Sequence, residues 1–232
     1  MMNPKIIVAL DYHDSNSALN LTTQLDPKHC RLKIGKELFT QSGPAIVKRL
    51  MNDGFDIFLD LKYHDIPHTV AKACKVAADL GIWMLNVHAL GGSTMMDAAR
   101  EAVGQSADRT LLIAATILTS MDQTTSDQIG LQGSIEDMVL RLARLADDSG
   151  LDGVICSAKE ATKLRIQHSN DFLLITPCIR LANSAKDDQH RIMTPTQAIK
   201  AGSNYLVIGR PITATRDPMA TLSAIQQSLA EQ

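Results

Sequence analysis

The stretch Phe55-Asp56-Ile57-Phe58-Leu59-Asp60-Leu61, followed directly by Lys62-Tyr63-His64-Asp65, shows the pattern that decides the fold. Its first part is short and mostly apolar, and charged residues begin where the apolar ones stop. A short apolar run of this kind is typical of a strand in a parallel sheet that is covered on both faces. The sequence therefore predicts a buried parallel strand over residues 55–61 with charged side chains at its carboxyl end.

Seven other short apolar runs repeat this pattern, and longer amphipathic segments separate them. One such segment begins at Ser134 and stops before Gly150, and another begins at Pro67 and continues to about Leu80. Serine or proline at the start and glycine after the end are typical of helices. Eight strand–helix alternations in 232 residues predict an α/β fold, a (β/α)8 TIM barrel forming a single domain over residues 1–232. An open, doubly wound sheet is the alternative. The expected strands span residues 6–10, 31–34, 55–61, 84–88, 111–118, 153–157, 172–176 and 205–209.

Composition excludes several classes of partner. The formal net charge is -2, from 23 basic and 25 acidic residues, so we expect neither nucleic acid nor an anionic membrane as a partner. No apolar run approaches the ~20 residues that span a bilayer. The four cysteines are scattered without a CxxC pair, which is typical of reduced thiols in a cytoplasmic protein.

The carboxyl ends of the expected strands carry the chemistry, as they do in known barrels. Residues two apart on a strand point to the same face, so Asp60 and Lys62 should project together, with Asp65 just beyond them. Lys33 ends the second expected strand and completes an array of alternating sign. Such an array can stabilise a developing carbanion and deliver a proton to it without a metal. A solvated turn with ordinary ion pairs is the alternative interpretation.

Two further clusters follow the seventh and eighth expected strands, where barrels often bind phosphate. The first is Thr176-Pro177-Cys178-Ile179-Arg180, and the second is Gly209-Arg210-Pro211-Ile212. Glycine lets backbone amides approach an anion closely, and arginine offers a planar fork to phosphate oxygens. Together the two clusters predict a phosphate site, although a tight turn with a surface arginine would explain either one alone.

In this order, the motifs resemble those of the orotidine 5′-monophosphate decarboxylase family. The resemblance extends from Asp11 to about Pro211. It implies a carboxy-lyase that converts orotidine 5′-monophosphate to uridine 5′-monophosphate (UMP), the last step of UMP synthesis, with no metal and no cofactor. Cys178 and His68 depart from the family pattern, which usually has glycine and asparagine there. The motifs that carry the resemblance are Lys33-Ile34-Gly35, Asp60-Leu61-Lys62-Tyr63-His64-Asp65-Ile66-Pro67-His68-Thr69, Asp187-Asp188-Gln189-His190-Arg191 with Thr194-Pro195, and Tyr205-Leu206-Val207-Ile208-Gly209-Arg210-Pro211-Ile212.

The resemblance also implies roles for individual residues. Lys62 would be the proton donor to C6 of the pyrimidine. Asp65 and Thr69 would reach into the site of a partner subunit, which implies a homodimer. Residues 181–189 would form a loop that closes over the substrate. The remaining roles are Lys33, Asp60 and Asp65 around the scissile carboxylate, Asp11 at the ribose hydroxyls, Thr119 and Ser120 at the pyrimidine, and Pro177, Arg180, Gln189, Gly209 and Arg210 in the substrate site, the last four holding phosphate.

Two rival functions remain from the sequence. Magnesium-dependent sugar-phosphate decarboxylases and aldolases share the barrel and the D-x-K-x-x-D pattern, but they have a metal-binding glutamate at the end of the second strand. Here that position is Lys33, which would repel a cation. A non-catalytic phosphate-binding barrel is the other alternative, and the crowded charges from Lys33 to Asp65 argue against it.

Overall fold

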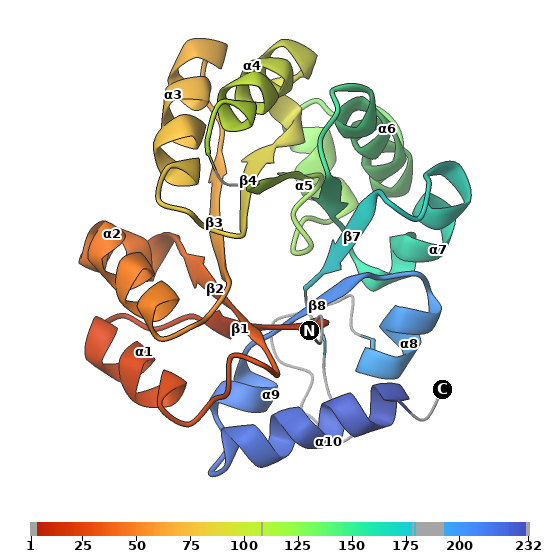
Figure 1. Cartoon of the computed structure of the whole chain (residues 1–232). Coiled ribbons are helices and arrows are strands. Elements are labelled where there is room, and N and C mark those ends of the chain that lie inside the picture. The colour runs from red at the N-terminus through yellow and green to blue at the C-terminus, as the bar shows by residue number, and fades with distance from the viewer. Residues whose placement is uncertain (1–3, 108, 178, 180–192, 231–232) are drawn as a thin grey trace.

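Eight parallel strands close into a barrel in the computed structural model, which describes residues 4–107, 109–177, 179 and 193–230. Each strand pairs with its neighbour in sequence, and β1 pairs with β8 to close the ring. Figure 1 shows the strands at the centre and the helices around them. The predicted (β/α)8 barrel is thus confirmed, and the open-sheet alternative is wrong. The strands are β1 (Ile6–Leu10), β2 (Arg31–Gly35), β3 (Ile57–Tyr63), β4 (Met84–His88), β5 (Leu111–Ala115), β6 (Gly153–Ile155), β7 (Leu173–Thr176) and β8 (Tyr205–Ile208).

The helices cover the outer face of this barrel. Ser134 caps α6 by accepting the backbone N–H of Asp137, and Pro67 occupies the first turn of α3, so both predicted helix starts are confirmed. No helix in the described ranges is both long and apolar enough to cross a membrane. The helices are α1 (Ser15–Thr22), α2 (Lys36–Asn52), α3 (Pro67–Ala78), η1 (Ala89–Gly91), α4 (Ser93–Gly104), α5 (Gln123–Gln128), α6 (Ile135–Asp148), α7 (Ala158–Gln167), α8 (Pro195–Lys200), α9 (Arg210–Thr213) and α10 (Pro218–Ala230).

Three strands end earlier than the sequence predicted, the eighth by a single residue. The fifth was expected to continue to residue 118 but ends at Ala115, where the Thr116 hydroxyl donates to the Ile155 carbonyl oxygen over 3.0 Å. The chain beyond Thr116 then lines a pocket. The sixth was expected to reach residue 157 but ends at Ile155, because Ser157 instead caps α7 in a capping box with Glu160. The remaining strand boundaries agree with the prediction or differ from it by one or two residues.

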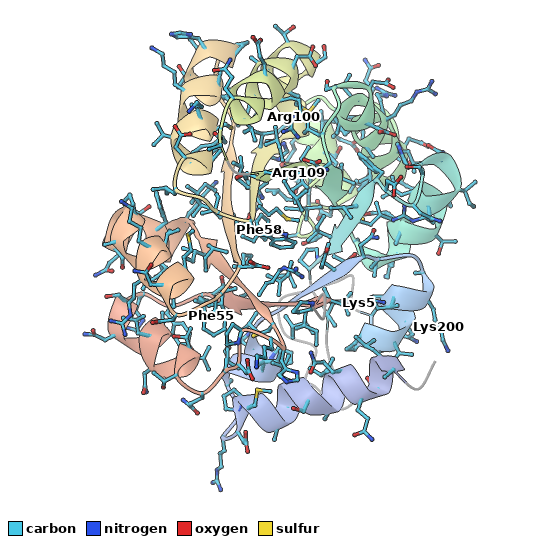
Figure 2. All side chains as sticks on the ribbon, viewed as in Figure 1. Lys5, Phe55, Phe58, Arg100, Arg109 and Lys200 are labelled. Carbon is cyan, nitrogen blue, oxygen red and sulfur yellow. The ribbon has the colours of Figure 1, made fainter. Side chains whose placement is uncertain are left out.

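The barrel interior is a packed core, separate from the larger core between strands and helices. Side chains of alternate residues point inward, as the period of a strand requires. Phe58 is fully buried there and lies at the barrel centre in Figure 2, whereas Lys200 lies on the outside. The interior cluster consists of Ile7, Ala9, Phe58, Met84, Ile113, Ile175, Tyr205 and Val207.

The amino end of the barrel is filled by three large side chains. Arg31 begins β2, Trp83 precedes β4, and Tyr205 begins β8. The Arg31 guanidinium lies 4.1 Å from the Trp83 ring centre and 5.3 Å from that of Tyr205, and the two rings meet edge to face. Arg31 also donates to Asp56 over 3.1 Å, so its buried charge is compensated. We call these three residues the basal cluster.

Candidate active site

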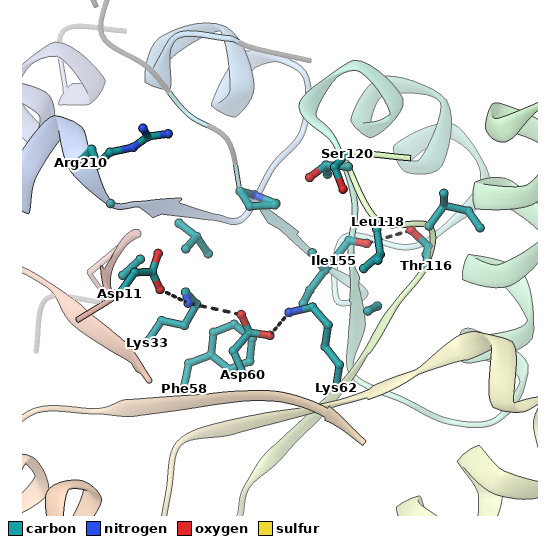
Figure 3. Close-up of a pocket in the computed structure, with 17 residues that line it drawn as sticks. Asp11, Lys33, Phe58, Asp60, Lys62, Thr116, Leu118, Ser120, Ile155 and Arg210 are labelled. Carbon is teal, nitrogen blue, oxygen red and sulfur yellow. Dashed lines mark hydrogen bonds and ion pairs between the residues drawn. The ribbon is translucent and has the colours of Figure 1, made fainter. Parts of the chain in front are cut away.

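A pocket of about 420 Å³ lies at the carboxyl ends of the strands, opposite the basal cluster. Figure 3 shows its lining side chains, with Lys62 and Arg210 on different sides of the cavity. The structure therefore brings together side chains that come from distant parts of the chain, as expected for the predicted barrel. The residues predicted from sequence that line it are Asp11, Lys33, Asp60, Lys62, Thr119, Ser120, Pro177, Gly209 and Arg210.

Four charged side chains form a row of alternating sign on one wall of the pocket (Figure 3). The Lys33 Nζ atom lies 2.9 Å from Asp11 Oδ1 and 3.4 Å from Asp60 Oδ2. The Lys62 Nζ atom lies 2.5 Å from Asp60 Oδ1. Asp60 therefore bridges two ammonium groups with its two oxygens. The ordinary solvated turn considered from sequence does not describe this row, because the side chains of Lys33 and Asp60 are only 10% and 12% exposed.

Burial and charge act against each other in this row. Burial by itself would lower the pKa of Lys33, but the charges of Asp60 and Asp11 outweigh it and raise that pKa above its usual value. Burial would likewise raise the pKa of Asp60, but the charges of Lys33 and Lys62 and the hydrogen bonds to the carboxylate lower it. Both groups are consequently charged at neutral pH, which an isolated buried ion would not be.

Strand β3 bulges where it carries Asp60 and Lys62. Its pairing with β4 jumps from Leu59 opposite Leu85 to Tyr63 opposite Val87, so three residues of β3 face one residue of β4. Within this bulge the backbone of Lys62 has φ 49°, the left-handed region that side chains other than glycine rarely adopt. Backbone strain of this type costs about 1–3 kcal/mol and is concentrated at functional sites.

Asn86 is the single residue of β4 that faces this bulge, and it was not among the residues predicted from sequence. It is completely buried. Its Oδ1 accepts the backbone N–H of Lys62 over 2.7 Å, and its Nδ2 donates to Asp60 Oδ1 over 2.7 Å. A lone asparagine in an apolar strand gives no sequence signal of this role, because only the register shows what it faces.

The apolar part of the pocket was also missed. Phe58 forms part of the floor, and Val207 and Ile155 lie beside it on other strands. In sequence these residues are indistinguishable from core residues that never meet a ligand. A flat, weakly polar ring would fit against such a surface while polar groups at the rim bind its substituents.

Two histidines lie near Lys62 without belonging to the row. The rings of His64 and His88 stack with their centres 5.4 Å apart. Burial lowers the pKa of His88 to about 4, with further lowering by His64, Lys62 and Lys36, so His88 is neutral at pH 7. Within the described ranges, no three His, Cys, Asp or Glu side chains are grouped closely enough to hold a metal ion.

Asp65 and Thr69 are the two predicted site residues of the described chain that do not line the pocket. Both are exposed, and Asp65 Oδ1 accepts the backbone N–H of Ile66 at the start of α3. Arg180 and Gln189, the expected closing loop of residues 181–189, and Cys178 lie outside the described residues. The phosphate prediction therefore rests here on Gly209, which precedes α9, and on Arg210, whose exposed side chain lines the pocket.

The fold and the pocket define a (β/α)8 barrel with a charged site at the carboxyl ends of its strands. A family model described as orotidine 5′-phosphate decarboxylase / HUMPS family matches residues 4–225. The chain belongs to this family.

Individual proteins agree with the family model. The orotidine 5′-phosphate decarboxylase of Nitrosococcus oceani is 58% identical to this chain, and the match covers 99% of each chain. That of Nitrosospira multiformis is 57% identical, over 100% of this chain and 96% of its own. The crystal structure of orotidine 5′-phosphate decarboxylase from Lactobacillus acidophilus superposes with a TM-score of 0.87 at 39% identity, covering 98% of this chain and 99% of the other. The resemblance predicted from the motifs is confirmed.

Proposed function

We propose that the protein decarboxylates orotidine 5′-monophosphate to UMP, the last step of UMP synthesis. The observation that carries this proposal is the buried row Asp11–Lys33–Asp60–Lys62, which lines the pocket of a chain whose relatives bear the name of this enzyme. Lys33 also argues against the magnesium-dependent alternative, since its ammonium occupies the position where a cation would need a carboxylate.

The reaction needs one bond broken and one proton supplied. Cleavage of the bond between C6 and the carboxylate releases carbon dioxide and leaves the electron pair on C6. The Lys62 ammonium stabilises that pair and then donates its proton to C6, after which solvent reprotonates the lysine. Asp60 holds this ammonium at 2.5 Å, so the donor is in place before the bond breaks.

The two ends of the substrate would lie on different sides of the pocket. We place the phosphate at Gly209 and Arg210, with Arg180 and Gln189 as further ligands, and the ribose hydroxyls at Asp11. Thr119, Ser120 and Pro177 then contact the pyrimidine. Supporting this arrangement, Arg210 lies at the start of α9 after β8, where barrels commonly bind phosphate, and it is separated from Lys62 in Figure 3.

We further propose a homodimer in which Asp65 and Thr69 complete the partner's site. Two observations support it. Both residues are exposed and lie outside the pocket of their own chain, and the neighbouring Ile66 is 66% exposed, an apolar side chain that a partner could cover. We expect the whole chain, residues 1–232, to act as one catalytic domain in the cytoplasm, without a membrane or nucleic-acid partner.

A direct assay tests the function. Purified protein is mixed with orotidine 5′-monophosphate in the presence of a chelator, and loss of the substrate's absorbance is followed with time. We expect turnover that added magnesium does not increase. Turnover that stops with chelator and returns with magnesium would favour the metal-dependent alternative, and binding without turnover would favour a non-catalytic phosphate-binding barrel.

A further inference from the structure

Asn86 is held in one orientation by two different partners on β3. The backbone N–H of Lys62 is a donor, so it requires the Oδ1 atom of the amide, and the Asp60 carboxylate is an acceptor, so it requires Nδ2. Turning the amide over would place donor against donor and acceptor against acceptor. The two bonds therefore fix each other, and both are 2.7 Å long.

The bulge makes the first of these bonds necessary. Three residues of β3 face Asn86 alone, so the N–H of Lys62 has no backbone carbonyl of β4 opposite it in the ladder. A buried N–H without a partner costs about 1–3 kcal/mol. The side chain of Asn86 takes the place of the missing carbonyl and holds Lys62 in its left-handed conformation.

The second bond controls the direction of the Asp60 carboxylate. Oδ1 of Asp60 receives both Nδ2 of Asn86 and Nζ of Lys62, which leaves Oδ2 directed to Lys33. Without the amide the carboxylate could rotate about its last bond and share its oxygens differently between the two lysines. One buried side chain therefore fixes both the backbone of Lys62 and the counter-ion of its ammonium.

We propose that Asn86 is a positioning residue of the reaction, which holds the Lys62 ammonium and the Asp60 carboxylate in their reactive arrangement through its two amide bonds. This inference rests on the proposed decarboxylation. It assigns to Asn86 no contact with substrate, since Asn86 does not line the pocket. Its effect should consequently appear in kcat, through the placement of the proton donor, and not in the binding of nucleotide.

Asn86→Asp is the sharpest test because it replaces one NH2 group by oxygen at almost constant volume. The Oδ1 acceptor for Lys62 is kept, but an ionised carboxylate would face Asp60. Burial and this like charge raise the pKa of the introduced carboxyl. Once protonated, it can donate to Asp60 as the amide does. The ratio of variant to native kcat should therefore rise as pH falls, by about tenfold per pH unit above that pKa.

Asn86→Ala removes both bonds and should lower kcat by about 100-fold at every pH, the scale of a small misplacement of a catalytic group. Calorimetric affinity for UMP should stay within a few-fold of native. Thr110→Val is the matched control, since it also removes a buried hydrogen bond, from Thr110 Oγ1 to the Ile82 carbonyl over 2.8 Å, at the amino end of the barrel. Its kcat should be unchanged.

The outcomes separate the positioning role from its alternatives. A native enzyme that fails to decarboxylate would refute the function itself. If the native enzyme is active, a kcat of Asn86→Asp that is equally low at every pH, or a native kcat for Asn86→Ala, would refute the positioning role. Two variants that do not fold, or a Thr110→Val variant as impaired as Asn86→Ala, would show that Asn86 is a residue of barrel stability alone.

Discussion

The Nζ atom of Lys62 lies 2.5 Å from Oδ1 of Asp60, two residues earlier on the same strand. In a regular strand such residues point to the same face but stand well apart along it. Here the backbone of Lys62 is left-handed, and its long side chain spans the distance to the carboxylate. The contact lies within the bulge in β3, and it joins a local irregularity of the sheet to the charge row of the pocket.

Removing the Lys62 ammonium should abolish turnover while sparing ligand binding. We expect Lys62→Ala to lower kcat by about 10³-fold or more, because it removes both a general acid and the charge that stabilises C6. Asp60 keeps its contact with Lys33, so the variant should fold and bind UMP. Single-turnover assays and calorimetry test this, with Lys200→Ala on the outside of the barrel as the control. Substantial turnover by Lys62→Ala would show that another group donates the proton.

Arg210 should act on the phosphate and not on the nucleoside. We expect Arg210→Ala to weaken UMP binding by roughly 10- to 100-fold, the scale of a charge-assisted hydrogen bond, and to leave uridine binding nearly unchanged. Calorimetry with both ligands measures the difference. Arg216→Ala, an exposed arginine just beyond α9, is the matched control. Equal losses for UMP and uridine would mean that Arg210 does not bind the phosphate.

Two inactive variants should restore activity when they share a dimer. Lys62→Ala and Asp65→Ala should each be nearly inactive as homodimers. If Asp65 serves the partner's site, both mutations fall in one site of the heterodimer, and the other site keeps native Lys62 and native Asp65. Co-expression with two different tags isolates the heterodimer for a decarboxylation assay.

The control for this experiment pairs Lys62→Ala with Lys33→Ala. Both of these residues line the pocket of their own chain, so each site of that heterodimer carries one mutation and should stay inactive. Verified Lys62→Ala/Asp65→Ala heterodimers as inactive as their parents would place Asp65 in its own subunit and refute the shared site.

The half-buried ring of His88 should make the fold less stable in mild acid. The pKa of His88 falls from 6.5 to about 4 on folding, so below pH 6.5 the unfolded chain binds a proton that the folded chain refuses. The free energy of unfolding should therefore decrease as pH falls through this window. We expect the melting temperature of the native protein to fall further between pH 7.5 and pH 5 than that of His88→Asn. This variant keeps an acceptor for the Leu90 N–H. Above about pH 7.5, where His88 is neutral in both the folded and the unfolded state, the difference in melting temperature between the two proteins should not change with pH. An equal pH dependence of the two proteins over the whole range would contradict the proposed burial effect.

The sequence was sufficient for the barrel and for the charged part of the pocket. Eight alternations of apolar strand and helix favoured the barrel over an open, doubly wound sheet, and in either fold parallel strands have their carboxyl ends on one side. On that basis the sequence predicts that Asp11, Lys33 and Asp60 lie together, and all three line the pocket.

The remainder of the site depends on geometry that a residue list does not contain. The role of Asn86 depends on the register between β3 and β4, which the sequence does not show. The left-handed backbone of Lys62 could not be predicted either, because glycine, the usual sign of this conformation, is absent from the stretch. Phe58 and Val207 are apolar residues whose exposure to the pocket depends on their depth in the barrel. The contribution of Asp65 depends on a second chain, so it stays a prediction.

The basal cluster has a consequence for the order of events in a catalytic cycle. Because Arg31, Trp83 and Tyr205 pack together at the amino end, the pocket opens on the opposite side, toward the carboxyl ends of the strands. Substrate and product then enter and leave through the same opening of the pocket. UMP that has not yet departed blocks the next orotidine 5′-monophosphate from entering. Inhibition by product should accordingly be competitive, with an apparent KM that climbs with UMP concentration while the maximal velocity holds constant.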